Sequence, residues 1–312
     1  MNMNNVIIFR FTKDIEFDEH TLAKKLQENA AKPLGPQEMR RSGWVVPELM
    51  ADNEFVRVVD GCFQIALRTE EKIIPGAVVK EMVAERAEEL EREQDRRVRS
   101  KERAEIKEQV ILEMLPRAFT KSSVSLAYID TVSKSLIVGE GSAKKAENLA
   151  STLRSAIGSL PIAPLSMKMN PAYAMTSLVD LKKDFDHKLA PGSNLVLTDP
   201  SGSGTKITCS GVDVHSDEIR KHIDASLQVT TMDFVWDENV SFSANDEMQL
   251  KKIRFGENLM DQADAGDIDD PAGYYDAMFS VFLGVVRDLS SDLISLMGGE
   301  NTDAYIESDE DE

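Results

Sequence analysis

The stretch that most constrains the fold is residues 71–121, which carry the longest helix-favouring pattern in the chain. A proline stands near each end, as Pro75 and Pro116, and between them Ala, Glu, Arg, Lys, Leu and Gln dominate, with Gly76 the only glycine. These residue types favour helix, whereas proline suits a first helical turn and cannot continue a helix. A single helix would be roughly 60 Å long at ~1.5 Å per residue, so a helical hairpin is the better prediction.

The apolar spacing predicts where this hairpin turns. Helical spacing runs from Val79 to Leu90, lapses, and resumes at Ile106, which places the turn at residues 98–101. The segment has twelve acidic and twelve basic residues, so it is neutral overall, but its positive charge gathers around the turn. The predicted basic tip of this projecting arm consists of Arg96, Arg97, Arg99, Lys101 and Arg103.

Length and composition predict a soluble protein. A chain of 312 residues is long enough for two or three domains, and no run of apolar residues approaches the length of a membrane span. The start of the chain lacks the pattern of a signal peptide, so we expect a cytoplasmic protein without a membrane partner. Cys62 and Cys209 are far apart and predict neither a disulfide framework nor a zinc site.

Negative charge is concentrated at one end. The formal charge is −19, but residues 257–312 contain sixteen acidic residues and one basic residue, Arg287, and so account for −15 of it. A local basic surface elsewhere is therefore compatible with the total. We expect residues 300–312 to be a disordered acidic tail, which either keeps the protein soluble or has an autoinhibitory or DNA-mimicking role.

The remaining pattern predicts an α+β fold with mixed or antiparallel sheets. Residues 1–70 and 122–166 are assigned to a central α+β domain, 71–121 to the hairpin and 167–299 to a C-terminal α+β domain. Predicted strands are 6–11, 43–47, 55–59, 63–68, 124–130, 135–138, 194–198, 205–209, 228–236, 240–244 and 250–255. Predicted helices are 18–31, 142–157, 216–224 and 274–297, the last with an apolar stripe for packing on the C-terminal domain or on another subunit.

A few residues in these elements have two interpretations. Trp44 suits a core position, with base stacking as the alternative. Lys144 and Lys145 lie in a first helical turn, against the helix dipole, so they either face an anionic partner or are simply solvated near an acidic neighbour. Lys252 and Arg254 fall on one face of a strand and present paired charge to a partner or to solvent.

No motif in the chain has the spacing of a catalytic, phosphate-binding or metal site. The four histidines are scattered, and the glycine-containing segment 199–204 lacks the spacing of a phosphate-binding loop and is predicted to be a hairpin loop. The aspartates at 264–270 lack the pattern of a calcium loop and predict an acidic surface loop. We therefore expect no enzyme activity, no cofactor and no metal.

Several short motifs, in order along nearly the whole chain, resemble the RdgC family of recombination-associated proteins found in bacteria and phages. The motifs are Gly-Trp-Val-Val-Pro at 43–47, Glu-Glu-Lys-Ile-Ile-Pro at 70–75, Leu-Pro-Arg-Ala-Phe at 115–119, Ile-Asp-Thr-Val at 129–132, Ser-Ala-Lys-Lys-Ala-Glu at 142–147 and Gly-Ser-Leu-Pro at 158–161. Weaker similarity continues through 217–223 and 250–255.

This resemblance implies a ring-shaped homodimer, associated with the nucleoid, that encircles duplex DNA without sequence preference and inhibits recombination by RecA. Binding of single-stranded DNA is left open. The matching motifs place Arg117 and Phe119 at a dimer contact and near the DNA channel. In one departure, residues 209–212 lack the basic finger that relatives can carry, so Lys144, Lys145, Lys252 and Arg254 become the expected DNA contacts. The basic tip of the arm matches the family in character and is also expected to contact DNA or the dimer mate. The competing hypothesis is a protein-interaction factor whose acidic end is a decoy for a DNA-binding partner.

Overall fold

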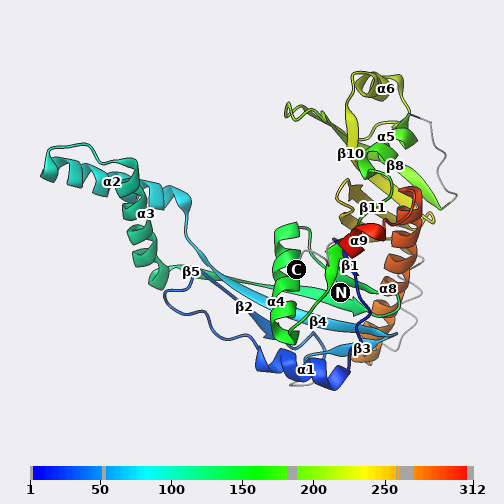
Figure 1. The fold of residues 1–312 in the computed structure, drawn as a ribbon, viewed down its shortest axis with the longest axis horizontal. Coiled ribbons are helices and arrows are strands. Elements are labelled where there is room, and N and C mark those ends of the chain that lie inside the picture. The colour runs from blue at the N-terminus through cyan, green and yellow to red at the C-terminus, as the bar shows by residue number, and fades with distance from the viewer. Residues whose placement is uncertain (1–2, 51–53, 181–187, 258, 260–269, 308–312) are drawn as a thin grey trace.

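A computed structural model describes residues 3–50, 54–180, 188–257, 259 and 270–307. The fold is α+β with antiparallel sheets, as predicted. Its outline is an open curve: a large sheet forms the base, a helical arm rises from one end, and a small sheet with its helices rises from the other (Figure 1).

The elements of the described residues are as follows. The helices are α1 (Glu19–Glu28), α2 (Gly76–Gln94), α3 (Ser100–Met114), η1 (Leu115–Arg117), α4 (Ala143–Ile157), α5 (Pro171–Val179), α6 (Asp217–Asp224), α8 (Pro271–Leu296) and α9 (Asp303–Glu307). The strands are β1 (Ile7–Phe11), β2 (Arg40–Val45), β3 (Arg57–Val59), β4 (Cys62–Ile73), β5 (Phe119–Asp130), β6 (Ser135–Val138), β7 (Ile162–Pro164), β8 (Leu189–Thr198), β9 (Lys206–Cys209), β10 (Gln228–Trp236), β11 (Val240–Asn245) and β12 (Leu250–Phe255).

The large sheet has the strand order β2-β4-β5-β6-β1-β7, with β3 beside β4. Side chains alternate between its two faces, and both faces are covered, so β1 is apolar on both sides. Ile7 and Phe9 point toward the core that includes α1 and α4, while Ile8 belongs to the core beneath α8. Trp44 is only 1% exposed in the first of these cores, which confirms it as a core residue and excludes base stacking.

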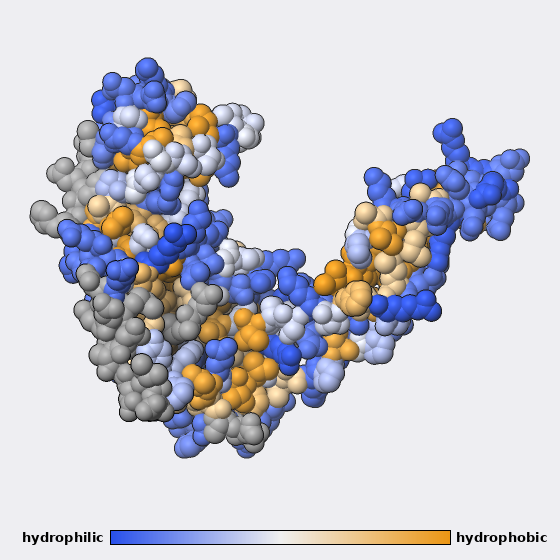
Figure 2. Space-filling model, turned by 180° about the vertical axis from the view of Figure 1, so that it is seen from behind, coloured by the Kyte–Doolittle hydropathy of each residue, from blue (hydrophilic) through white to orange (hydrophobic). Residues whose placement is uncertain are grey.

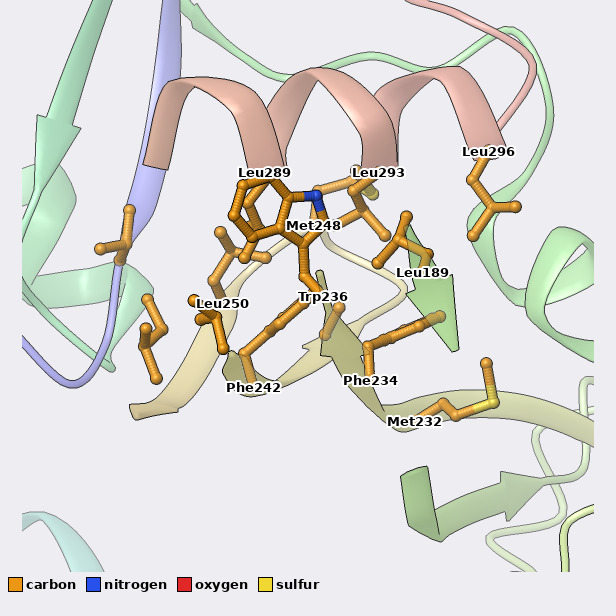
Figure 3. Close-up of a cluster of buried hydrophobic side chains, with 14 of the residues drawn as sticks. Leu189, Met232, Phe234, Trp236, Phe242, Met248, Leu250, Leu289, Leu293 and Leu296 are labelled. Carbon is orange, nitrogen blue, oxygen red and sulfur yellow. The ribbon is translucent and has the colours of Figure 1, made fainter. Parts of the chain in front are cut away.

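The small sheet has the order β12-β11-β10-β8-β9, and α8 covers one of its faces. Figure 3 shows Leu289 and Leu293 of α8 above Trp236 and Phe242. This burial explains the long apolar pattern of α8, which was predicted to pack on the C-terminal domain.

α8 also packs on the large sheet, which the sequence did not predict. The rings of Phe279 in α8 and Tyr128 in β5 stack with their centroids 4.7 Å apart. The two sheets are further joined where the backbone of Val6 exchanges hydrogen bonds of 2.8 and 2.9 Å with Leu250. Residues on either side of the predicted boundary at 166 therefore share one hydrophobic core.

The arm, comprising α2, α3 and η1, is the predicted helical hairpin with two corrections. The turn lies at residues 95–99, not at 98–101, because Asp95 adopts a left-handed conformation (φ 49°) that ends α2, and Ser100 already begins α3. The hairpin is also shorter than 71–121. The strands β4 and β5 continue as a paired ribbon as far as Ile73 and Phe119, so the helices start at the end of this ribbon.

The prediction that the disordered tail begins at residue 300 is wrong. Residues 300–307 are structured: Glu300 bridges to Met167, α9 follows, and Tyr305 is 7% exposed. An aromatic ring and an ion pair with Arg10 anchor this segment, and a count of acidic residues does not detect such contacts. Residues 308–312 lie outside the described residues, as do residues 264–269 of the predicted acidic loop.

Candidate nucleic-acid interface

The predicted DNA-binding residues occupy separate places along the curve instead of one patch. Five lie around the turn of the arm, Arg117 lies at its base, two begin α4 on the large sheet, and two lie on β12 of the small sheet. Most of the rim of the opening between the arm and the small sheet is hydrophilic, whereas apolar residues gather where the arm meets the large sheet (Figure 2). The positions therefore suit an extended anionic polymer better than a small ligand.

Four cations gather at a groove of about 110 Å³ at the start of α4, which we call the α4 groove. The predicted Lys144 and Lys145 meet two cations that the sequence analysis missed, Arg40 of β2 and Lys121 of β5. Strand pairing brings the latter two together, because Arg40 lies opposite Glu71, and Glu71 lies opposite Lys121. In the sequence, the adjacent Arg40 and Arg41 hint at a basic site. They could not be assigned to this groove without knowing which strands pair and in what register.

The chemistry of the α4 groove suits phosphate oxygens. Hydroxyl groups of Ser123, Ser125 and Ser142 line the groove beside the cations. Ser142 occupies the N-cap of α4, as predicted, but its side chain makes no capping hydrogen bond, and the positive end of the helix dipole lies there. Two carboxylates reduce the positive charge: Glu71 lines the groove, and Glu140 lies 3.5 Å from the Lys145 ammonium.

Lys252 and Arg254 share one cavity, of about 290 Å³, on the face of the small sheet opposite α8. This agrees with the prediction that both lie on one strand face, although Lys252 has a positive φ of 54°. Asp233 and Asn194 line the same cavity, and the Asn194 amide donates to Asp233 at 2.6 Å. The cavity is therefore polar, with both signs of charge.

At the turn of the arm, part of the predicted basic tip is already paired. The Arg96 guanidinium donates to both carboxylate oxygens of Glu102, at 2.5 and 2.9 Å. This bidentate bond, and then the bond from the Arg99 backbone amide, lower the pKa of Glu102 to about 2. No ion pair is recorded for Arg97, Arg99, Lys101 or Arg103 among the described residues, and all four are exposed.

Phe119 and an apolar groove expose hydrophobic surface on the arm and its base. Phe119 is 84% exposed at the first position of β5, two residues after Arg117 and opposite Ile73, which is 49% exposed. Between α2 and α3 lies a groove of about 580 Å³, which we call the arm groove. It is lined by apolar residues such as Val79, Val83 and Ile111 and also by three cations, Lys80, Lys107 and Arg103 of the basic tip. Exposed apolar surface of this kind is typical of sites that contact another molecule.

No catalytic constellation accompanies these surfaces in the part of the chain that the structure describes. There, no three His, Cys, Asp or Glu residues converge as metal ligands. Cys62 is buried, and burial raises the pKa of its thiol. Among the described helices, none is sufficiently long and apolar to cross a bilayer.

The fold and surfaces define an antiparallel α+β protein with a projecting helical arm and basic sites spread along a concave outline. Residues 1–300 match the family described as "Putative exonuclease, RdgC", and the chain belongs to this RdgC family. Relatives named recombination-associated protein RdgC occur in Psychromonas ingrahamii (34% identical over 302 residues, covering 97% of this chain and 100% of the relative) and Pseudomonas aeruginosa PAO1 (35% over 304 residues, 96% and 98%). The relative from Aeromonas hydrophila is 34% identical over 300 residues, covering 96% of this chain and 99% of its own.

Proposed function

We propose that this protein is a non-enzymatic, sequence-independent DNA-binding protein. In this proposal it encircles duplex DNA as a ring-shaped homodimer, acts at the nucleoid, and inhibits recombination by RecA. The family's description names an exonuclease, while the relatives are named for recombination. Binding rather than cleavage is supported by the cationic groups, because charge neutralisation of phosphates provides affinity without reading sequence.

The observation that carries the proposal is the α4 groove. Four cationic side chains from β2, β5 and α4 converge there with serine hydroxyls, on the large sheet that spans the base of the curve. Neutralising phosphates with Lys and Arg releases condensed counterions, so affinity falls with salt concentration. The small-sheet pair and the arm tip would add contacts to the same polymer, since duplex DNA presents phosphates along its whole length.

The homodimer is supported by the exposed apolar surface of the arm. Most dimers of identical chains have two-fold symmetry, in which the same patch contacts itself on the partner. Phe119 of one copy and the arm groove of the other satisfy that requirement, because each copy carries both features. Two open curves joined in this way, with a second contact between their remaining ends, would enclose a hole for DNA.

The salt dependence of duplex binding tests the proposal. We expect log affinity to fall linearly with log salt, and the double variant Lys144→Ala, Lys145→Ala to lower the slope by about 2, since each phosphate contact contributes ~0.9. The measurement is fluorescence anisotropy of a labelled duplex at several salt concentrations. The matched control replaces Lys24 and Lys32, at and just after α1 on the outer side of the curve, and should leave the slope unchanged (Figure 1). Absence of duplex binding at low salt, or an equal slope loss in both variants, would refute the proposal.

A further inference from the structure

A second polar cavity lies where α8 and the C-terminal segment meet the large sheet, and the proposed DNA contacts do not involve it. Its volume is about 240 Å³, and we call it the junction cavity. Four apolar side chains line it, namely Ile8, Ile137, Val286 and Ile294. The rest of the lining is polar: Arg10, Ser133, Ser135, Arg287, Ser290, Ser291 and Glu300. The cavity is therefore amphipathic and contains two guanidinium groups.

Both carboxylates near these arginines are already engaged by the fold. Glu300 accepts from Arg10 Nε at 2.7 Å and Nη2 at 2.9 Å, and it also accepts from the Tyr305 hydroxyl at 2.7 Å. Asp130, which is fully buried, accepts from Arg287 Nε at 2.8 Å and Nη2 at 2.7 Å, and from the Ser133 hydroxyl at 2.5 Å. Little acceptor capacity remains for a further donor.

Two donors in the cavity lining remain without an acceptor. The Ser290 hydroxyl is buried and has no hydrogen-bond partner among the described residues. Arg287 uses Nε and Nη2 for Asp130 and the Asp60 carbonyl, and its Nη1 has no acceptor in the described part of the chain. Buried polar groups are nearly always satisfied by protein, water or ligand, so the buried Ser290 hydroxyl indicates an occupant that accepts a hydrogen bond. Arg287, whose side chain is 21% exposed, offers Nη1 as a second donor to the same occupant.

We infer that the junction cavity binds a small oxyanion of the phosphate class. Phosphate oxygens accept several hydrogen bonds and match the planar fork of arginine. A cation would face two guanidinium groups, and an apolar ligand would leave the buried Ser290 hydroxyl unsatisfied. Because Arg10 holds Glu300, an anion here would also compete with Glu300 and loosen the C-terminal segment.

Thermal unfolding of the full chain in phosphate against chloride, at equal ionic strength and without DNA, tests this inference. A ligand that binds only the folded state raises the unfolding temperature with its concentration. We expect inorganic phosphate or adenosine monophosphate to raise it, and Ser290→Val to weaken the apparent affinity about tenfold, because that change removes a donor and fills the cavity. Ser295→Val, at an exposed position of the same helix, is the matched control and should behave as the parent.

The α4 groove also carries cations, so an anion acting there would shift the unfolding temperature as well. Only a comparison between variants isolates the contribution of the junction cavity. The Ser290-dependent part of the shift should persist in the variant with Lys144→Ala and Lys145→Ala, so this test and the DNA-binding test can fail independently. A larger shift with the mononucleotide supports a nucleotide as occupant, and equal shifts support free phosphate. If Ser290→Val is stable and responds to both anions as the parent does, the cavity holds only water and the inference is wrong.

Discussion

The arm and helix α8 are both largely helical, but they use their apolar residues in opposite ways. The arm has a core of three buried residues, Val79, Val83 and Val110, and leaves a groove beside it open. α8 lies between two sheets and buries residues such as Phe279 and Leu289 around much of its surface. The comparison teaches that α8 completes the fold of one copy, whereas the arm leaves apolar surface exposed, which the proposed dimer would use.

The ion pairs of the arm and of α8 also differ, because the pair on the arm is exposed and the pair on α8 includes a buried carboxylate. Arg86 and Glu113 pair on the arm with side chains 33% and 57% exposed, and ion pairs at the surface contribute little to stability because water screens them. Arg287 of α8 pairs with Asp130, which is fully buried. Removing one partner of a buried pair leaves an uncompensated charge, so the α8 pair matters more to the stability of the fold.

The largest expected effect comes from truncating a ring in the α8 core. Phe279→Ala should lower the free energy of unfolding by about 3–5 kcal/mol, because it leaves a cavity against Tyr128. Val83→Ala in the arm core should cost about 1–2 kcal/mol and act locally, since few buried neighbours surround it. Denaturant unfolding measures the first effect and amide hydrogen exchange of residues 76–114 the second. Equal global losses would show that the arm is an integral part of the core.

The second largest loss of stability is expected when the buried ion pair of Arg287 and Asp130 is broken, and the size of this loss should depend on pH. Burial raises the pKa of Asp130, but hydrogen bonds from Arg287 and Ser133 outweigh burial and leave it below its usual value of 3.8. A carboxyl with a lowered pKa adds stability above its unfolded pKa, and this stability is lost as pH falls through the folded value. Asp130→Asn should cost about 3 kcal/mol at pH 7. Its deficit should shrink below about pH 4, where the parent also protonates.

The control for this pH dependence is Asp14→Asn, which removes a carboxylate that is 84% exposed and paired with Lys134. Denaturant unfolding of parent and both variants from pH 3 to 8 makes the comparison. A deficit for Asp130→Asn that does not change with pH would contradict a role for its charge.

A smaller effect on the fold, but a large one on assembly, is expected at Phe119. Phe119→Asp should leave the stability of a single copy unchanged, because the ring is 84% exposed. It should weaken dimerisation by about 2 kcal/mol or more and reduce DNA affinity with it. Light scattering gives the mass, and Val132→Asp, at a residue 65% exposed in the turn after the other end of β5, is the matched control. An unchanged dimer would remove Phe119 from the interface.

The smallest effect is expected at the turn of the arm. Glu102→Gln removes the carboxylate that holds Arg96. The Arg96 guanidinium is then free and should raise duplex affinity by less than about threefold, because a single exposed charge contributes little. The gain should vanish in high salt. Anisotropy titrations measure it, with Glu105→Gln, on an exposed face of α3, as the control. Equal gains in both variants would indicate a general charge effect without a specific role for Arg96.

Local pattern was sufficient to predict most elements. The alternation in 228–236 predicted β10, and helix formers between two prolines predicted the arm. Helix α5 was missed although Asn170-Pro171 marks its start, with the Asn170 side chain accepting from the Tyr173 amide at 3.1 Å. Its nine residues are short and mostly apolar, so they lack the polar face that identifies an amphipathic helix.

The candidate site was predicted only in part. Lys144 and Lys145 were recognised because they oppose a helix dipole, which is a property of neighbouring residues. Arg40 and Lys121 join them only through the register of β2, β4 and β5, and pairing across a sheet depends on contacts remote in sequence. The pairing of Arg96 with Glu102 was also missed, because the true turn at 95–99 brings them together.

The sequence by itself determined the α+β class, the helical arm and the family, because periodicity, proline positions and ordered motifs are local properties. Only the tertiary structure decided that α8 joins both sheets, that residues 300–307 are anchored, and that cations from three elements meet at the α4 groove. The physical reason is that these features depend on buried contacts and strand register between distant residues, whose free energy exists only once the chain is packed.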